Sequence, residues 1–286
     1  MGVRTGKNRK LADGLSYLLL VVLAQIWLFP FFGIVMQSFR SYAAEYGGMT
    51  DYFIPHRFSL DNYRFLFSGE TNYPRWYGNT MLLAVATSVI QTLIVVCVSY
   101  VFSRIHFRGR EGLMKFFLVL KLFPGFLTLI CLYFLLKSAG LTEDGAIVGL
   151  ILVYTASSGM EYYICKGFMD TIPKSLDEAA MLEGATRLQV LTKVVLPLAR
   201  PAIIYTMLTA FMLPWGDFMM ASYISFGNDA TCNVAVAMQR WTTVADYQGY
   251  FTRFCAGGVL AAIPVTILFM ILQRYYLEGV SGAVKG

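Results

Sequence analysis

Three ionisable side chains lie inside long apolar stretches of this sequence, where charge could do chemistry. Lys121, Glu161 and Asp217 each sit within a run long enough to cross a bilayer. A charge at the centre of a membrane helix costs about 2.5–3.5 kcal/mol on the insertion scale, so each needs a compensating contact or a function. Either they pair with one another or with backbone groups, or they line a polar path between helices. We expect Glu161 and Asp217 to face the interior of a helix bundle.

Most catalytic and metal chemistry has no support in the sequence. A phosphate-binding loop of the G-x-x-x-x-G-K-[ST] type and a zinc-binding H-E-x-x-H are both absent. The two histidines, His56 and His106, are predicted on opposite sides of the membrane, and serines in the apolar runs have no histidine base nearby. The five cysteines form neither a disulfide framework nor a metal cluster. We therefore predict that the chain binds no cofactor or metal and is not an enzyme.

The composition is that of a polytopic membrane protein. Of 286 residues, 57% are hydrophobic and 14% are charged, against roughly 25% charged in a soluble domain. A bilayer-spanning helix needs about 20 mainly apolar residues. The sequence predicts an all-α fold in a single membrane domain, 1–286, with six transmembrane helices. These are residues 15–37, 77–103, 113–136, 146–167, 201–226 and 254–273.

The distribution of Lys and Arg predicts the orientation. With the N-terminus in the cytoplasm, most of the 23 Lys and Arg residues fall on the cytoplasmic side, as the positive-inside rule requires. The net charge of +6 therefore reports topology, and a nucleic-acid-binding function has little support. The predicted cytoplasmic segments are 1–14, 168–200 and 274–286, and the long external loops are 38–76 and 227–250. Aromatic residues in 38–76 are interpreted either as an interfacial belt or as a docking surface.

The cytoplasmic segment between Asp177 and Pro201 is built unlike an ordinary connecting loop. Ser175 and Glu178 have capping-box spacing, and Gly184 suits the C-terminus of a first short helix. Thr186 can cap a second helix, which Pro197 would end. This pattern predicts a rigid elbow of two short helices on the membrane surface, available to a partner.

The elbow also carries a family pattern. Glu178-Ala179-Ala180, three residues, Gly184, nine residues and Val194-x-Leu196-Pro197 resemble the EAA loop of ABC importer permeases. Val194 replaces the commoner isoleucine, and Glu183 the commoner aspartate. The resemblance extends over nearly the whole chain and is closest to the smaller permease of maltose/maltodextrin-type pairs. The further segments that carry it are Phe58 to Tyr63, Phe123-Pro124-Gly125, Lys166-Gly167-Phe168, Thr171-Ile172-Pro173, Glu278-Gly279 and Ala283 to Gly286.

The resemblance implies a type I importer architecture and an assembly in the bacterial cytoplasmic membrane. The implied partners are a second homologous permease, two cytoplasmic ATPase subunits that hold ATP and magnesium, and an extracytoplasmic sugar-binding protein. An oligosaccharide, maltose or maltodextrin, would be the substrate, moved by alternating access.

Several residues acquire expected roles from the resemblance. The ATPase-coupling residues are Glu178, Ala179, Ala180, Gly184, Leu196 and Pro197. The tail residues expected to contact the ATPases are Glu278, Lys285 and Gly286. Candidates for contact with the binding protein are Asn228, Asp229, Asn233 and Gln239. Candidates for the translocation path are Lys121, Tyr154, Ser157, Glu161, Trp215 and Asp217, of which Tyr154, Ser157 and Trp215, together with Ser158, could instead pack helices.

Two other functions stay open at this point. The first is an ion-coupled secondary sugar transporter that acts alone and uses the three intramembrane charges. The second is an interaction or scaffold protein. Dependence of uptake on ATP and on a binding protein would distinguish the importer from both.

Overall fold

The computed structural model describes residues 6–41, 54–122, 125–243 and 247–283, and within these ranges the secondary structure is helical apart from one isolated β-bridge between Arg40 and Phe58. The chain divides into two compact units. Unit 1 comprises residues 1–71 and 241–260, and unit 2 comprises residues 72–240 and 261–286. The C-terminal helix α15, Tyr247–Ala283, begins in unit 1 and ends in unit 2.

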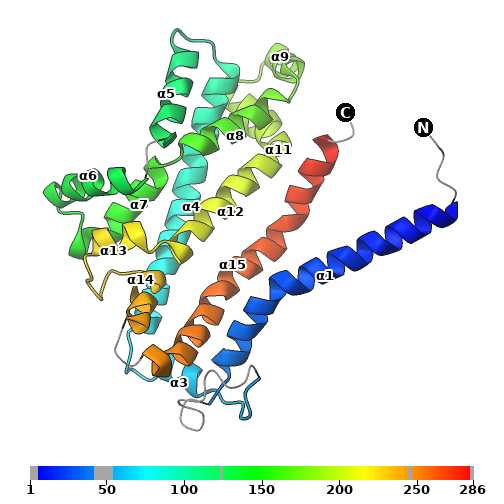
Figure 1. Ribbon diagram of the computed structural model, residues 1–286. Coiled ribbons are helices and arrows are strands. Elements are labelled where there is room, and N and C mark those ends of the chain that lie inside the picture. Colours follow the sequence, from blue (N-terminus) through cyan, green and yellow to red (C-terminus); the bar gives the residue numbers. More distant parts are fainter. Residues whose placement is uncertain (1–5, 42–53, 123–124, 244–246, 284–286) are drawn as a thin grey trace. The chain divides into compact units, whose positions relative to one another are not determined.

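A buried polar junction joins three elements of unit 1. It contains α1 (Gly6–Ser38), the short α3 (Asp61–Phe67) and the start of α15 (Figure 1). The fully buried Asn62 amide donates to the carbonyls of Ser38 at 3.0 Å and Arg40 at 2.8 Å, and its oxygen accepts from the Thr252 hydroxyl at 3.0 Å. All of these groups are paired, so the junction carries no desolvation penalty from an unpaired amide.

One aromatic residue of the first external loop, Phe65, packs within unit 1, whereas Phe58 and Phe67 are exposed. Phe65 lies against Trp241 and Tyr250, and the Arg253 guanidinium lies 3.5 Å from its ring centre. A cation over an aromatic face is favourable, most of all away from water. This part of the loop is therefore an internal cluster, whereas residues 42–53 lie outside the described structure.

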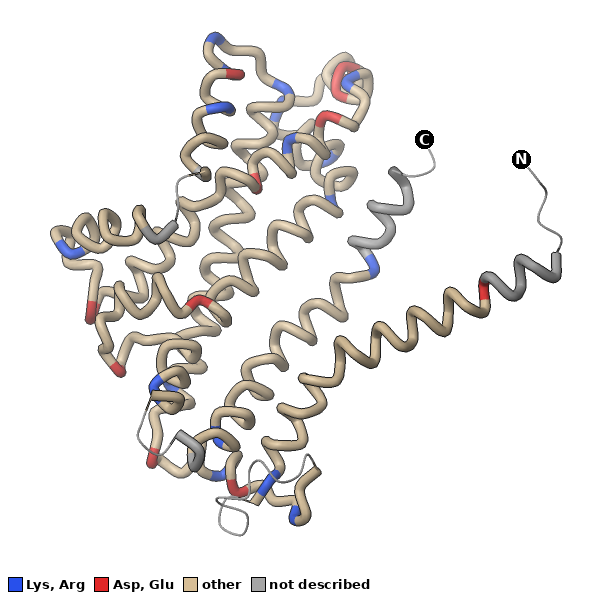
Figure 2. Tube along the Cα trace, in the orientation of Figure 1, with Lys and Arg blue, Asp and Glu red and all other residues tan. Residues whose placement is uncertain are grey.

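Unit 2 is organised around α4, Tyr73–Arg104, which packs against α12, Arg200–Gly216 (Figure 1). Neither helix carries a charged residue along its long middle part (Figure 2). Small hydroxyl side chains join α4 to its neighbours: Ser88 donates to the Met207 carbonyl at 3.0 Å, and Ser99 to the Tyr162 carbonyl at 3.2 Å. Small polar residues allow membrane helices to approach closely and to bond across the contact.

The remaining elements of unit 2 are short. They are α5 (Arg110–Leu122), α6 (Gly125–Ser138), η1 (Glu143–Gly145), α7 (Ala146–Ala156), α8 (Gly159–Asp170), α9 (Lys174–Leu182), α10 (Arg187–Val190), the π-turn η2 (Leu191–Val195), α11 (Leu196–Leu198), α13 (Met219–Ser225) and α14 (Val234–Gln239). The 3-10 turn η3, Arg240–Thr242, lies at the boundary of the units.

The six predicted spans are not all continuous helices. Three described helices are long and apolar enough to cross a membrane: Asp13–Ser38, Tyr73–Arg104 and Tyr250–Arg274. Two bent pairs, Leu127–Ser138 with Glu143–Ala156 and Arg187–Leu198 with Arg200–Gly216, raise the number to five if each pair is one span. The first, second and sixth predicted spans correspond to the continuous helices, the fourth and fifth are interrupted, and the described parts of the third lie in α5 and α6.

Local side-chain bonding explains two of the interruptions. The hydroxyls of Ser157 and Ser158 donate to the carbonyls of Val153 and Thr155 where α7 ends. Asp217 accepts backbone N–H bonds from Met220 at 3.2 Å and Ala221 at 3.1 Å, so it caps α13 after α12 has ended. Such bonds satisfy backbone groups that a break would leave orphaned. Residues 123–124, between α5 and α6 in the third predicted span, lie outside the described structure.

Candidate functional site

The elbow, residues 174–198, has the two helices that its sequence predicts, but its first helix starts differently. The predicted capping box of Ser175 and Glu178 does not form: α9 begins at Lys174, and its N-cap, Pro173, makes no side-chain bond. Ser175 is already the second helical residue, so it cannot adopt the extended backbone of a cap.

The turn of the elbow follows its local sequence closely. Gly184 adopts φ of +90°, its N–H bonds to the Met181 carbonyl at 3.0 Å, and the Ala185 N–H bonds to the Ala180 carbonyl at 3.0 Å. This is a Schellman motif, which favours glycine because the left-handed conformation is costly for a residue with a Cβ. Thr186 and Gln189 then form a complete capping box. These predictions are confirmed.

The second helix of the elbow is continuous to Leu198 but is not α-helical throughout. Residues Leu191–Val195 form a π-turn, and Pro197 lies at the start of the next α-helical turn. Proline lacks an N–H, so it removes one bond from the regular ladder, and π-turns of this kind occur often at functional sites. The predicted end at Pro197 is therefore one residue early.

The last turn of α4 anchors both helices of the elbow. The Nε atom of Arg104 lies 2.7 Å from the Asp177 carboxylate of α9, and these side chains are only 5% and 8% exposed. Arg104 also donates to the Ile172 carbonyl at 3.0 Å. One turn earlier, the Tyr100 hydroxyl donates to the Arg187 carbonyl of α10 at 3.2 Å. The negative Asp177 at the start of α9 and the positive Arg104 at the end of α4 also complement the two helix dipoles.

A third contact ties α8 to the same end of α4. The Ser103 hydroxyl donates to Asp170 at 2.6 Å, and Lys166 forms an ion pair with that carboxylate. Partial burial alone would raise the pKa of Asp170, but the hydrogen bonds from Lys166 and Ser103, with the charges of Lys166 and Arg110, outweigh it and hold the pKa below its usual value. Asp170 is therefore negative at neutral pH and retains these bonds.

Apolar packing completes the mount of the elbow. Val190, Leu191 and Val195 from its second helix are buried in one cluster with Tyr100 and Met169, and Ala180 packs against that cluster. The elbow is thus fixed to α4 and α8 by three kinds of contact. These are the apolar cluster, the hydrogen bonds that Tyr100 and Arg104 donate to backbone carbonyls, and the buried Arg104–Asp177 ion pair. A displacement of the elbow would therefore displace the end of α4 as well, because tightly packed protein interiors deform little.

The six predicted coupling residues divide between the outer and inner faces of the elbow. Glu178, Ala179, Gly184 and Pro197 are exposed, whereas Ala180 and Leu196 pack inward. A side chain at Gly184 would meet nothing within 4 Å in this chain, so the structure requires glycine there for its backbone conformation.

Sequence reasoning missed the apolar part of the exposed face. Leu182 is 90% exposed and Leu188 is 69% exposed, and Leu176 and Met181 of the same segment are also exposed. Large apolar side chains exposed on a polar segment are the kind of surface that a partner protein can cover. The sequence did carry one indication of this exposure. Leu182 directly precedes the polar turn of Glu183 and Gly184, a position that is usually at the surface. The Arg104–Asp177 pair left no such signal, because its members are far apart in the sequence.

Of the residues predicted along the translocation path, the structure brings Tyr154 and Asp217 together. Tyr154 is buried, and its hydroxyl donates to Asp217 at 2.5 Å. Asp217 is thus a helix cap with a tyrosine partner. One carboxylate oxygen of Glu161 is buried without a hydrogen-bond partner among the described residues. Trp215 packs against Tyr77 and Phe211, whereas Ser157 is exposed. The side chain of Lys121 is outside the described part.

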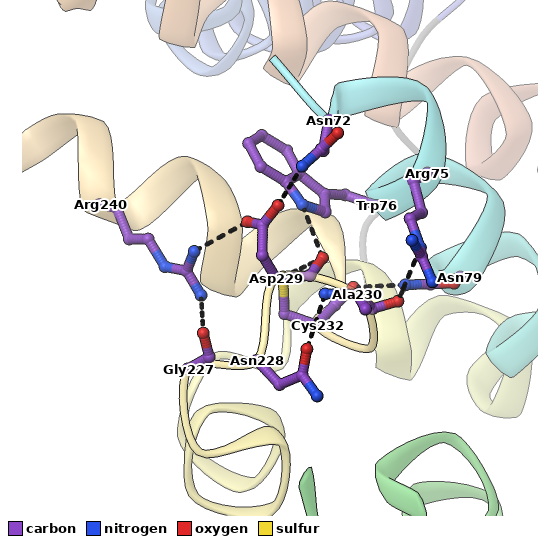
Figure 3. A network of polar contacts seen from close by, with 10 residues as sticks. All are labelled: Asn72, Arg75, Trp76, Asn79, Gly227, Asn228, Asp229, Ala230, Cys232 and Arg240. Carbon is purple, nitrogen blue, oxygen red and sulfur yellow. Dashed lines mark hydrogen bonds and ion pairs between the residues drawn. The ribbon is translucent and has the colours of Figure 1, made fainter. Parts of the chain in front are cut away.

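Two of the residues predicted to contact a binding protein, Asn228 and Asp229, lie in a network of polar contacts with the start of α4 (Figure 3). Asp229 bonds to Asn72 and to Arg240, and its carbonyl accepts from the Trp76 ring at 3.1 Å. Asn79 donates to the carbonyls of both Ala230 and Cys232 at 3.0 Å. The loop that begins at Gly227 is therefore fastened to α4 by side-chain bonds to its backbone.

The other predicted contact residues also have partners within the chain or are partly buried. Asn233 is fully buried, caps α14 and donates to the Pro214 carbonyl at 2.9 Å, so we do not propose it as a contact. Asn228 donates to Asp144 at 2.7 Å. Gln239 is half-buried. Of the tail residues, the side chain of Glu278 is not described, and Lys285 and Gly286 lie outside the described residues.

No group of His, Cys, Asp and Glu that could hold a metal occurs among the described residues.

Known proteins similar to this chain are transport components. Residues 96–281 match the family described as binding-protein-dependent transport system inner membrane component. A maltodextrin transport system permease protein of Streptococcus pneumoniae is 32% identical over 283 residues, with 98% of each chain covered. A galactooligosaccharides transport system permease protein of Bacillus subtilis is 33% identical, with 95% of each chain covered.

A solved structure shares the fold along nearly the whole length. The crystal structure of a bacterial ABC transporter involved in the import of alginate includes a chain that superposes with a TM-score of 0.77 at 20% identity, covering 96% of this chain and 100% of that one. The chain therefore belongs to the family of binding-protein-dependent transport system inner membrane components, and it is a multi-pass, non-catalytic membrane subunit of such a system.

Proposed function

We propose that this chain is a membrane subunit of an ABC importer that moves an oligosaccharide delivered by an extracytoplasmic binding protein. Relatives named for maltodextrin and for galactooligosaccharides are similarly close, at 32% and 33% identity. A structural neighbour that transports alginate has been solved in complex with a periplasmic protein bound to an alginate pentasaccharide. These relatives support an oligosaccharide substrate, and maltodextrin is our specific proposal.

The observation that carries the proposal is the construction of the elbow. It is rigidly mounted on the end of α4 through Arg104 and Asp177, and it presents Leu182 and Leu188 outward. We propose that two ATPase subunits, which hold ATP and magnesium, engage this outer face. Their closure would move the elbow as one body, and α4 with it, so that this chain and a second permease alternate between two arrangements.

The orientation follows from the same assignment. The elbow and α5 would lie on the cytoplasmic side with both chain termini, and the network of Asp229 on the outer side. Lys and Arg gather around the α5 and α9 end of unit 2 (Figure 2), as expected for a cytoplasmic end.

Uptake by vesicles containing the assembled transporter tests the function. We expect accumulation of labelled maltodextrin to require both ATP and the binding protein and to persist when the proton gradient is dissipated. Galactooligosaccharide and alginate oligosaccharide serve as competing substrates. Uptake without ATP that collapses with the proton gradient would favour the ion-coupled alternative, for which Glu161, with one buried and unpaired carboxylate oxygen, is a candidate.

A variant of the elbow tests the coupling role. Leu182→Asp places a charge on an exposed residue, so the fold should persist while ATPase docking weakens. Leu60→Asp, on another exposed leucine in unit 1, is the matched control. We expect at least a tenfold loss of transport for Leu182→Asp with normal membrane insertion, and near-normal transport for Leu60→Asp. Equal transport by both variants would refute the docking role.

A further inference from the structure

A basic cavity of about 660 Å³ lies in unit 2, apart from the outer face of the elbow. It is formed by the turn that follows α4, the first residues of α5 and the side of α8. Its charged lining consists of Arg110, Glu111, Lys115 and Lys166, with His106 beside them. The lining thus has three side chains that are positively charged at neutral pH, Arg110, Lys115 and Lys166, and one acidic side chain, Glu111.

The cations of this cavity are only partly neutralised by the protein. Lys166 is paired with Asp170, whose carboxylate also feels the charge of Arg110. The side chains of Arg110 and Lys115 make no hydrogen bond or ion pair with any other residue in the described part of the chain. The lining together with Asp170 therefore holds three cations and two acids, and an excess of positive charge remains for an anionic ligand. The N-terminus of α5, a helix of 13 residues, lies at the same cavity and adds the positive end of its dipole.

The surroundings of the cavity are apolar on the side of α5. Phe107 and Met114 contribute to the lining, and Met114 is buried. Farther along α5, the exposed side chains include Leu113, Phe116, Val119 and Leu120. A ligand that suits both parts has an anionic head of phosphate size and an apolar body that can follow a helix.

We propose that this cavity binds the phosphate head of an anionic phospholipid from the cytoplasmic leaflet, with its acyl chains along the exposed apolar face of α5. The cytoplasmic leaflet carries anionic lipids, and basic pockets beside membrane helices on that side bind such heads. Arg110 supplies a planar fork of donors for phosphate oxygens, and Lys115 a second positive charge. The proposal uses the orientation given above but does not depend on the transported substrate or on ATP.

Native mass spectrometry of the intact transporter released from defined bilayers tests the proposal. We expect wild-type protein from bilayers of equal phosphatidylglycerol and phosphatidylcholine to retain phosphatidylglycerol selectively. Arg110→Gln with Lys115→Gln should lower that retention about 25-fold, from roughly fivefold per charge near the surface. The matched control, Arg64→Gln with Lys137→Gln, removes two cations elsewhere and should change retention less than twofold.

The outcomes separate the alternatives. Unchanged retention in the cavity variant, or equal retention of phosphatidylcholine by wild type, would overturn the proposal. Displacement of the lipid by 20 mM inorganic phosphate, a concentration chosen on the order of weak phosphate binding, would mean that the site takes free phosphate instead. If the cavity variant fails to assemble, the double variant Arg110→Lys with Lys115→Arg, which keeps both charges, is used instead. This variant must retain phosphatidylglycerol. Loss of the lipid from it would refute the electrostatic explanation.

Discussion

The ion pair of Arg104 and Asp177 should determine how firmly the elbow is held on α4. Both side chains are almost completely buried, and their closest atoms are 2.7 Å apart. Removing one partner of a buried pair leaves the other charge uncompensated and typically costs about 3–5 kcal/mol. Asp177→Asn keeps the shape of the side chain but removes its charge, so most of that cost should fall on the docking of α9.

Hydrogen exchange of the backbone amides of α9 measures this cost directly. At about 1.4 kcal/mol per factor of ten, a loss of 3–5 kcal/mol increases the opening equilibrium of α9 by about 100- to 5,000-fold. We expect exchange in α9 of Asp177→Asn to accelerate by that factor in a lipid nanodisc, with little change at the start of α4. The assay does not require the transport partners.

Two further variants make the measurement decisive. Lys166→Met breaks a pair whose side chains are 20% and 38% exposed, so its effect should stay below about tenfold. Arg104→Met with Asp177→Leu replaces both charges by apolar groups and should restore slow exchange, since such replacements of buried pairs are often neutral. If Asp177→Asn leaves exchange in α9 unchanged, or if Lys166→Met matches it, the ion pair is not what holds the elbow.

Three other predictions concern single residues of unit 2. Gly184→Ala should lower the unfolding temperature by a few degrees, because an alanine in the left-handed conformation costs about 1–2 kcal/mol. The control Gly167→Ala, within α8, should not lower the unfolding temperature. Equal effects of the two variants in thermal unfolding would contradict this prediction. Burial raises the pKa of the Cys232 thiol to about 11, so at pH 8 only about one thiol in a thousand is ionised, and labelling of the folded protein by N-ethylmaleimide, followed by mass spectrometry, should spare Cys232 relative to the denatured protein. The pKa of Asp170 is lowered from 3.8 by folding, so its contribution to stability is present above that value and is lost as the pH falls through the folded-state pKa; Asp170→Asn should be less stable than wild type at pH 6, and chemical unfolding should show this difference vanish at acid pH.

The elbow shows which features local sequence can predict. Gly184 and Thr186 were predicted in their roles because a left-handed C-cap and a capping box depend on residues only a few positions apart. The start of α9 was predicted incorrectly at Ser175, because the helix already begins at Lys174, directly after Pro173. Ser175 therefore lies in the first helical turn, where its side chain cannot act as an N-cap.

The interrupted spans show a second limit. Average hydropathy predicted one helix over 201–226, yet the chain turns at Asp217, where one carboxylate takes two backbone N–H groups and the Tyr154 hydroxyl. The same carboxylate was predicted as a charge on a polar path. A window average registers one charge among many apolar residues, but it does not register which backbone groups that charge can satisfy.

The sequence by itself determined that this is a membrane protein, where its three uninterrupted spans lie, the turn of the elbow at Gly184, and the family pattern around Glu178 and Gly184. These depend on total apolar length and on short-range backbone chemistry, which any stretch of chain carries with it. Only the tertiary structure decided that Arg104 holds Asp177, that Leu182 points outward and that Arg110 and Lys115 share a cavity. Each of these depends on contacts between residues that are far apart in the sequence. Burial strengthens such contacts, and it exists only once the helices have packed.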